Sequence, residues 1–378
     1  MIYVDHAATS PTHPKVVEAM LPFFTQSFGN PSSIHQFGRK TREVLNQARE
    51  AISQQIGVNE KEIIFTSGGT EADNTALLGV MLANRDKGNH LITTEIEHPA
   101  VLKTCQFLES IGFDVTYLPV NQYGRVSVED VKKAVKEQTV LVSVMYGNNE
   151  VGTIQPIQEI GQFLHEQSIY FHTDAVQAFG INQLHAATLK IDLMSVSAHK
   201  FNGPKGIGFL YIKEGIPFTS FMHGGDQERK RRGGTENLPA IVGMVKAAKL
   251  AEKKREDNLQ LYASFRQILL QTFKESGIRF VVNGDESHHL PHILNVSFLG
   301  VKAEVMLVNL DLAGIAASSG SACTAGASLP SHVLVSMFQN DTSRIESAIR
   351  FSFGYGNTEE EIHLVAKKTA EIVKRLQK

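Results

Sequence analysis

Short apolar runs alternate with helical patterns through the first two hundred residues of this chain. The runs are EIIFTS, HLITTE, FDVTYLPV, VLVSVMY, IYFHTD and DLMSVSA, at residues 62–67, 90–95, 113–120, 140–146, 169–174 and 192–198. Each run is apolar on both faces, which is typical of strands that lie between two layers of helices. Strands that alternate with helices along the chain predict an α/β fold whose sheet is mostly parallel.

A long helical pattern begins near Asn237 and continues to about residue 275, and its middle is polar. A helix with a polar middle predicts a connection between two domains. The segments RFVVN, HILNVSF and AIRFSFG that follow predict strands, and residues 302–312 and 358–377 predict helices. We therefore expect a second, smaller α+β domain after the long helix.

The length of the chain, 378 residues, is sufficient for two hydrophobic cores. We expect the large domain to comprise residues 13–255. The small domain is then made of residues 1–12 and 256–378, and it carries Cys323 and Arg350.

The charge balance and the cysteine count exclude several classes of partner. The formal net charge is -2, so no overall field favours nucleic acid or an anionic membrane. The two cysteines, Cys105 and Cys323, are too few for a disulfide framework or a thiolate metal site. The first residues lack the pattern of an export signal, and no apolar run approaches the roughly 20 residues of a membrane span. We expect a cytoplasmic protein without a metal, a membrane partner or direct nucleic-acid contact.

Two short clusters could suggest a different chemistry. HHLPH, at residues 288–292, brings three histidines together, but a metal site is disfavoured there. ERKRR, at residues 228–232, is basic, and its simplest interpretation is a solvated loop rather than a nucleic-acid contact.

Polar residues follow the predicted strands at the points where the strands end. In an open α/β sheet, ligands bind beyond the carboxyl ends of the strands. The polar clusters at these positions are Gly68–Thr70, Glu97–His98, Asn148–Glu150, Asp174–Gln177 and His199–Lys200. Clusters at corresponding positions of several strands predict one site along this edge of the sheet.

The stretch FTSGGTEADN combines a strand end, a glycine turn and a helix start. Free backbone N–H groups and the helix dipole at such a point suit a phosphate group. The chain contains no Walker GxxxxGK[ST] and no GxGxxG sequence, so the usual nucleotide fingerprints are absent. The alternative is an ordinary helix start in which Thr70 and Glu71 have capping roles.

Lys200 and Asp174 stand at the ends of two strands that look fully buried. A lysine against an apolar wall loses its proton more easily, which suits Schiff-base chemistry, although Lys200 could instead be a solvated turn lysine like Lys205. A carboxylate at the position of Asp174 could hold a protonated pyridine nitrogen, or it could cap the segment that follows.

His98 and Arg350 also allow two interpretations. His98 lies at a strand-to-helix junction, where a histidine can cap the helix or contact a ligand ring. Arg350 lies inside a predicted strand, where its guanidinium could bind a carboxylate ligand or form a structural ion pair. Together, a phosphate cradle, a strand-end aspartate, a histidine and a buried lysine are what pyridoxal 5'-phosphate requires.

The motifs of the chain resemble those of the cysteine desulfurases, including the bacterial iron–sulfur-assembly branch. The similarity runs from about residue 2 to the end, through YVDHAATSP, FGNPSSIHQFGR, FTSGGTEADN, EHPAVL, NNEVGTIQPI, HTDAVQAFG, SAHKFNGPKGIGFLYI, GGDQERKRRGGTEN, SSGSACTAG and IRFSFG. The resemblance implies the fold-type I architecture of pyridoxal phosphate enzymes, with a mostly parallel seven-stranded sheet, and a homodimer. Small departures, such as Ala198 in place of a glycine, remove no reacting group.

The resemblance also implies a role for individual residues toward the cofactor. Lys200 would form the Schiff base with it, Asp174 would pair with the pyridinium nitrogen, and His98 would stack on the ring and move protons. Gln177 would reach the phenolic oxygen of the ring. The phosphate would be held by Gly69, Thr70, Ser197 and His199, together with Thr235 from the other subunit.

For the substrate, L-cysteine, the resemblance implies that Asn149 and Arg350 hold the carboxylate, with Asn30 as a further contact. Cys323 would be the nucleophile that takes the sulfur as a persulfide while the substrate becomes L-alanine. The segment SSGSACTAGASLP, at residues 318–330, is rich in small residues, which would let Cys323 reach both the cofactor and the surface. Cys105 lies in an apolar helical pattern and is expected in the core.

Other interpretations of the same residues stay open. The protein could be an aminotransferase or a β-lyase in which Cys323 is idle, or a selenocysteine lyase, or a scaffold without the cofactor. The protein that accepts the sulfur could be an iron–sulfur scaffold or an enzyme that makes 2-thiouridine in tRNA. The GGDQERKRRGGTEN and GNNEVGTIQ variants and the short C-terminus resemble the tRNA-thiolation type more closely.

Overall fold

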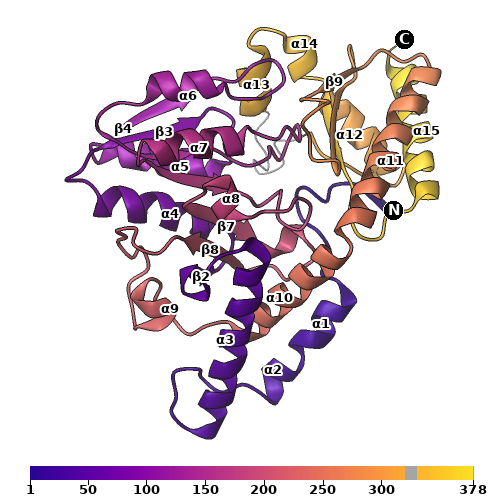
Figure 1. The fold of residues 1–378 in the computed structure, drawn as a ribbon. Helices are drawn as coiled ribbons and strands as arrows, with labels where there is room; N and C mark the ends of the chain where they lie inside the picture. The colour runs from indigo at the N-terminus through magenta and orange to yellow at the C-terminus, as the bar shows by residue number, and fades with distance from the viewer. Residues whose placement is uncertain (320–329, 378) are drawn as a thin grey trace.

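The computed structural model describes residues 1–319 and 330–377, and its central element is a seven-stranded sheet (Figure 1). The strand order is β2-β8-β7-β6-β5-β3-β4. The strands are β2 Ile63–Thr66, β3 His90–Thr94, β4 Asp114–Leu118, β5 Thr139–Ser143, β6 Tyr170–Asp174, β7 Leu193–Ser197 and β8 Gly208–Ile212. Among these seven strands, β8 runs antiparallel to the other six. The predicted α/β fold with a mostly parallel sheet is confirmed, and each of the six predicted runs overlaps one strand.

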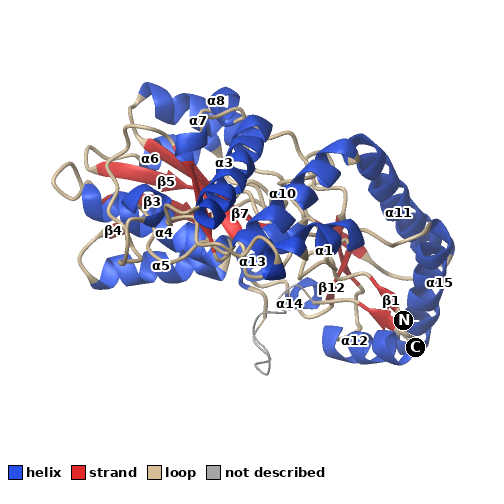
Figure 2. Cartoon of the chain, turned by 90° about the horizontal axis from the view of Figure 1, so that it is seen from below, coloured by secondary structure: helices blue, strands red, loops and turns tan. Residues whose placement is uncertain are grey.

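Helices cover both faces of this sheet, which is why its strands are apolar on both sides (Figure 2). One face packs against α3 Gln36–Ile56, α7 Ile157–Glu166 and α10 Leu238–Lys253, and the other packs against α4 Gly69–Ala83 and α5 Pro99–Ser110. Successive residues of a strand enter opposite cores, as Leu91 and Ile92 of β3 do. Cys105 is buried in the second of these cores, as predicted.

A separate hydrophobic core lies in the part of the chain after α10. A three-stranded antiparallel sheet has the order β12-β10-β9, from Ala348–Ser352, Ile293–Ser297 and Val281–Asn283. Around it pack α11 Arg255–Glu275, α12 Ala303–Leu312 and α15 Glu359–Leu376. Val4 of the N-terminal segment enters the same core, and β1 Ile2–Tyr3 pairs with β11 Ile315–Ala316. The domain boundaries at residues 12 and 255 stay a prediction.

The long helix expected from Asn237 to about residue 275 is in fact two helices, α10 and α11, which are interrupted at Lys254 (Figure 1). The backbone of Lys254 has φ -103° and ψ 5°, which lies outside the helical region. No glycine or proline marks the interruption, so the residue pattern contains no signal for it. Helix α10 contributes to the core of the large sheet, and α11 contributes to the core of the small sheet.

The remaining elements are short helices and 3-10 turns. They are α1 Pro14–Met20, α2 Pro22–Thr25, α6 Val128–Ala134, α8 Ala186–Leu189, α9 Gln227–Lys230, α13 His332–Phe338, α14 Thr342–Ile345, and the 3-10 turns η1 Glu60–Glu62 and η2 Ala198–Lys200. Helix α2 and the start of α3 extend away from the large sheet at one end of the molecule (Figure 1). Within the described residues, no helix combines the length and the apolar character that a membrane span needs.

Candidate active site

A cavity of about 630 Å³ lies where the ends of β2, β6 and β7 meet the start of α4. Its walls include, among others, most of the residues predicted for the site: Gly69, Thr70, His98, Asn149, Asp174, Gln177, Ser197, His199, Lys200 and Arg350. The carboxyl ends of parallel strands meet at one edge, and this geometry brings residues that are far apart in the sequence together.

The start of α4 forms one end of the cavity. Gly68 has a φ of 151°, a conformation that L side chains rarely adopt, and Gly69 is so close to Val176 that a Cβ there would lie 2.8 Å from its Cγ2. No side chain caps this helix, so its first N–H groups are available to a ligand. The interpretation of Thr70 as an ordinary cap is therefore not supported. Anions bind at helix starts of this kind.

Glu71, in the first turn of α4, has a structural role. Its carboxylate accepts a hydrogen bond from the Ser67 N–H and forms an ion pair with Arg232 at 2.8 Å. Arg232 belongs to the ERKRR run, in which Glu228 is buried and bonded to Arg49 at 2.7 Å. The expectation of a solvated loop holds for the exposed Arg229 and Lys230 and is wrong for Glu228, which is buried.

Asp174 ends β6 with its carboxylate at the cavity. Its Oδ1 accepts a hydrogen bond from the Val176 N–H at 2.9 Å, so it does cap the segment that follows. Among the described residues, no hydrogen-bond donor reaches its other oxygen. Burial raises the pKa of Asp174, while the nearby charges of His98 and Lys200 lower it. A cation bound in the cavity would favour the ionised carboxylate further.

Lys200 lies at the end of η2 and points inward rather than into solvent. Its Nζ donates hydrogen bonds to the carbonyl oxygens of Ala7 at 2.5 Å and Ala8 at 2.8 Å. The neighbouring His199 contacts Thr9 through Nδ1 at 3.0 Å, and burial lowers the pKa of His199 to about 4. The N-terminal segment therefore holds the lysine amine at the cavity wall.

His98 both caps a helix and borders the cavity, so the two interpretations made from the sequence hold together. Its Nδ1 accepts a hydrogen bond from the Ala100 N–H at 3.1 Å, at the start of α5. Burial lowers the pKa of His98, and the charge of Asp174 opposes this shift. With Nδ1 as an acceptor, the neutral ring carries its proton on Nε2, which leaves Nε2–H available to donate.

Arg350, in the middle of β12, has the structural ion pair that was one of its two interpretations. Its Nη2 donates to Oδ1 of Asp5 at 2.7 Å, and its Nη1 donates to the carbonyl oxygen of Asn149 at 2.8 Å. The Nε of Arg350 is buried without a hydrogen-bond partner in the described part of the chain. Arg350 also borders the cavity, so the same guanidinium forms the ion pair with Asp5 and lies at the site.

Sequence reasoning missed several residues that line the cavity, among them Ala7, Ala8 and Asp73. Ala7 and Ala8 line it, but a segment of small residues without periodicity gave no signal beyond the YVDHAATSP motif. Asp73 lies four residues after Gly69 and hence on the same side of α4, a spacing that could have identified it. Burial and the charge of Asp174 raise the pKa of Asp73 well above its usual range, which favours a protonated Asp73.

Three predicted residues are not part of this cavity in the described chain. Asn30 lies exposed between α2 and α3, and Thr235 lies exposed between α9 and α10. Cys323 lies outside the described residues. On either side of it, Ser318 pairs with the backbone of Arg350, and Ser331 donates to Oε2 of Glu150 at 2.5 Å. The roles of Asn30, Thr235 and Cys323 stay predictions.

The chain matches the family described as "Aminotransferase class-V" over residues 2–365. Fold and cavity together thus define an enzyme of the pyridoxal phosphate-dependent class. A "Putative cysteine desulfurase IscS 1" of Bacillus subtilis (strain 168) is 57% identical over 375 residues, which are 99% of each chain. A "Cysteine desulfurase IscS" of Clostridium botulinum (strain Hall) is 48% identical and covers 99% of this chain and 94% of its own length. The chain belongs to the cysteine desulfurase family.

Solved structures agree with this placement. A "NifS-like protein" superposes with a TM-score of 0.93 at 36% identity and covers 99% of both chains. A structure described as "SspA in complex with cysteine" superposes with a TM-score of 0.81 at 35% identity and covers 93% of this chain and 99% of its own. The predicted family and fold class are confirmed.

The residues of the cavity fit pyridoxal phosphate, the cofactor of this class. The glycine start of α4 is a cradle that a Cβ at Gly69 would partly fill. Asp174 presents a carboxylate oxygen that no described donor engages, and Lys200 presents a primary amine. These groups match a phosphate, a protonated ring nitrogen and an aldehyde carbon, respectively.

Proposed function

We propose that this protein removes sulfur from L-cysteine and leaves L-alanine and a persulfide on Cys323. The observation that carries the proposal is that Lys200, Asp174 and the start of α4 border one cavity. The relatives named as cysteine desulfurases support the reaction, and so does the neighbour whose structure is described as a complex with cysteine.

The start of α4 and the end of β7 are suited to hold the cofactor phosphate, through Gly69, Thr70, Ser197 and His199. When bound, pyridoxal phosphate supplies an aldehyde carbon that joins amines and a ring that accepts electrons. Asp174 would stabilise a protonated ring nitrogen, and Gln177, whose Nε2 donates to the Ala7 carbonyl at 3.0 Å, would contact the phenolic oxygen of the ring.

Lys200 and His98 are the proton carriers of the proposed site. The amine of Lys200, released from the carbonyl oxygens of Ala7 and Ala8, accepts the proton of the substrate Cα. The Nε2–H of His98 is available to donate a proton during the reaction, because its Nδ1 already accepts a hydrogen bond from the Ala100 N–H. Arg350 and Asn149 hold the substrate carboxylate. Asn30, which lies outside the cavity of a single copy, stays a prediction for the same role.

Cys323 completes the reaction as a thiolate. Its sulfur attacks the substrate sulfur, so an S–S bond forms while the Cβ–S bond of the substrate breaks. The electron pair of the broken bond stays with the substrate carbon, which takes up a proton and ends as L-alanine. Cys323 then carries the transferred sulfur as a persulfide, and no external oxidant is required.

We propose that the protein works as a homodimer, because Thr235 would reach the cavity only from a second copy. A group of exposed apolar side chains on α1 to α3 supports an interface there: Leu21, Phe24, Phe28, Ile34 and Phe37. Large apolar side chains that cluster at a surface mark interaction sites. Light scattering of the parent protein should give twice the monomer mass, and a monomer would contradict the proposal.

The sulfur acceptor is proposed to be a protein, either an iron–sulfur scaffold or a tRNA-uridine thiolase, with no direct contact to nucleic acid. The net charge of -2 disfavours direct contact with RNA. A cytoplasmic location fits a reactive persulfide, which requires a reducing compartment. Transfer of labelled sulfur to each purified candidate acceptor separates the two.

The decisive experiment measures alanine released from L-cysteine with dithiothreitol present. We expect the parent and Cys105→Ala, which removes the other thiol, to turn over, and Cys323→Ser to be inactive. Lys200→Ala should lose both activity and the covalent cofactor, whereas the exposed Lys213→Ala should keep both. Equal turnover by Cys323→Ser and the parent would instead identify a β-lyase or aminotransferase. Activity on selenocysteine but not on cysteine would identify a selenocysteine lyase.

A further inference from the structure

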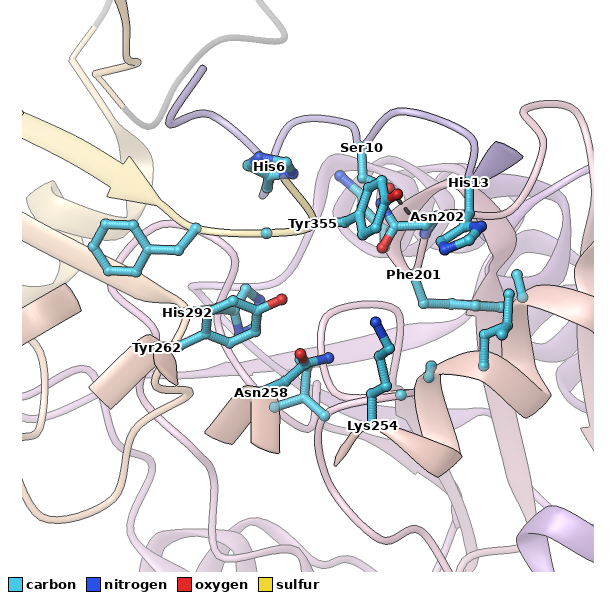
Figure 3. A pocket seen from close by; sticks show the side chains of 18 residues that line it. His6, Ser10, His13, Phe201, Asn202, Lys254, Asn258, Tyr262, His292 and Tyr355 are labelled. Carbon is cyan, nitrogen blue, oxygen red and sulfur yellow. Dashed lines mark hydrogen bonds between the residues drawn. The ribbon is translucent and has the colours of Figure 1, made fainter. Parts of the chain in front are cut away.

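A second, smaller pocket of about 90 Å³ shares the N-terminal segment with the cofactor cavity (Figure 3). Ala7 and Ala8 line the cofactor cavity, whereas His6 and Ser10 line the second pocket. Lys200 borders both. The other polar walls of the second pocket come from the α10–α11 junction and from the small domain: Lys254, Asn258, Tyr262, His292 and Tyr355. The pocket therefore lies where the two cores meet.

Two buried histidines in this pocket have ring nitrogens without partners. His6 is 5% exposed and His292 is 7% exposed, and the Nδ1 of each has no hydrogen-bond partner among residues 1–319 and 330–377. Burial lowers the pKa of His6 to about 4 and the pKa of His292 to about 3, so both rings are neutral at pH 7. Both Nδ1 atoms are closed to solvent, and a Cβ at Gly354 would lie 2.2 Å from the Nδ1 of His6, so the two neutral rings form uncharged walls of the pocket.

The charged side chains of the pocket walls indicate which kind of ligand would bind there. Lys254 lines it, no aspartate or glutamate stands among its described lining residues, and Lys254 forms no ion pair within the described chain. His13 also lines the pocket, and its pKa is lowered first by burial and then by the positive charge of Lys254. Figure 3 shows the amine of Lys254 directed into the space that Tyr262 and His292 border. An ammonium group and hydroxyl donors without an acidic partner favour an anion.

The size of the pocket limits the anion. A volume of 90 Å³ holds about six to nine water molecules, since each needs roughly 10–15 Å³. A tetrahedral oxyanion with five heavy atoms fits such a space, and a nucleotide does not. We propose that this pocket is a binding site for a small inorganic oxyanion, phosphate or sulfate, held by Lys254 and Tyr262. This site is independent of the proposed desulfurase reaction.

Isothermal titration calorimetry of the cofactor-loaded protein with sodium phosphate tests the proposal, at an ionic strength kept constant with sodium chloride. The visible absorption of the bound cofactor is recorded in each sample, so that phosphate binding in the cofactor cavity is excluded. We expect one saturable site in the parent and in Lys253→Gln, a matched control because Lys253 is an exposed neighbour outside the pocket. In Lys254→Gln the Kd should rise about tenfold or more.

Two further measurements keep the proposal falsifiable. Tyr262→Phe removes only one hydroxyl and should raise the Kd severalfold without unfolding the protein. Sodium sulfate should bind to the same site as phosphate and compete with it. The proposal is overturned if neither anion shows saturable binding, if Lys254→Gln binds as tightly as the parent, or if acetate binds as tightly as phosphate, which would indicate a carboxylate site.

Discussion

Arg350 of β12 donates a hydrogen bond to Oδ1 of Asp5 at 2.7 Å, and this ion pair joins the N-terminal segment to the small sheet. The same guanidinium, only 2% exposed, reaches the carbonyl oxygen of Asn149 at 2.8 Å. Two fixed partners thus hold its plane beside the cofactor cavity. A guanidinium that is oriented in advance loses little side-chain entropy when it binds a carboxylate.

The substitution Arg350→Lys tests this role. Lysine keeps the positive charge but lacks the planar fork that reaches Asn149 and Asp5 together. We expect the KM for L-cysteine to rise about tenfold or more, because two parallel hydrogen bonds to the carboxylate are lost, while kcat changes less. Steady-state assays of alanine release give both constants. Arg344→Lys is the control, since Arg344 bonds to Asn283 outside the cavity; an equal KM increase in both variants would contradict the role.

Gly69→Ala tests the cradle at the start of α4. The added Cβ would lie 2.8 Å from Cγ2 of Val176, so the helix start or Val176 must shift. Overpacking of this kind costs about 1–3 kcal/mol, and we expect the affinity for pyridoxal phosphate to fall about tenfold. Absorption titration of the cofactor-free protein measures it. The double variant Gly69→Ala/Val176→Ala removes the close contact and should recover most of the affinity, with Val176→Ala alone as control. No recovery would contradict the steric account.

His172→Gln tests the buried network beneath the site. His172 contacts Ser143 at 2.8 Å and Ser195 at 3.0 Å, and complete burial lowers its pKa to about 3. Below a pH of about 6.5, His172 binds a proton in the unfolded chain but stays neutral in the folded chain. The free energy of unfolding therefore falls as the pH falls. Between pH 7 and pH 5 this effect lowers the free energy of unfolding by about 2 kcal/mol, and a glutamine at position 172, which does not titrate, lacks it.

We therefore expect His172→Gln to be less stable than the parent at pH 7 by about 1–2 kcal/mol, because a buried hydrogen bond is lost. At pH 5 this deficit should shrink or reverse. Urea unfolding at both pH values measures the two free energies, and a difference between parent and variant that does not change with pH would disprove the assignment.

Ser331→Ala tests the contact that holds the start of α13. Ser331 is buried, donates to Oε2 of Glu150 at 2.5 Å and caps the helix by accepting from the Leu334 N–H. Its loss leaves a buried carboxylate without that donor, so we expect the free energy of unfolding to fall by about 1–3 kcal/mol. Ser336→Ala is the matched control, since Ser336 makes a comparable bond to Glu95 at the surface, where the cost should stay below about 1 kcal/mol. Equal losses would show that burial is not the cause.

Much of this protein follows from its sequence because the relevant signals are local. The apolar runs predict the parallel strands, since a strand buried on both faces must be apolar throughout. The strand-end rule placed Asp174, His98 and Lys200 at one edge of the sheet, because the direction of the strands fixes that edge. The cradle, the aspartate, the histidine and the lysine together indicated the cofactor, and the motif resemblance then supplied the reaction, which no periodicity could reveal.

The tertiary structure alone decided the contacts between segments that are distant in the sequence. The pairing of Arg350 with Asp5 depends on how the N-terminal segment packs between the two cores, and so do the hydrogen bonds from Lys200 to the carbonyl oxygens of Ala7 and Ala8. The interruption at Lys254 and the pocket beside it have the same origin. Packing against two separate cores sets the direction of α10 and α11, and the sequence between them contains no residue that breaks a helix.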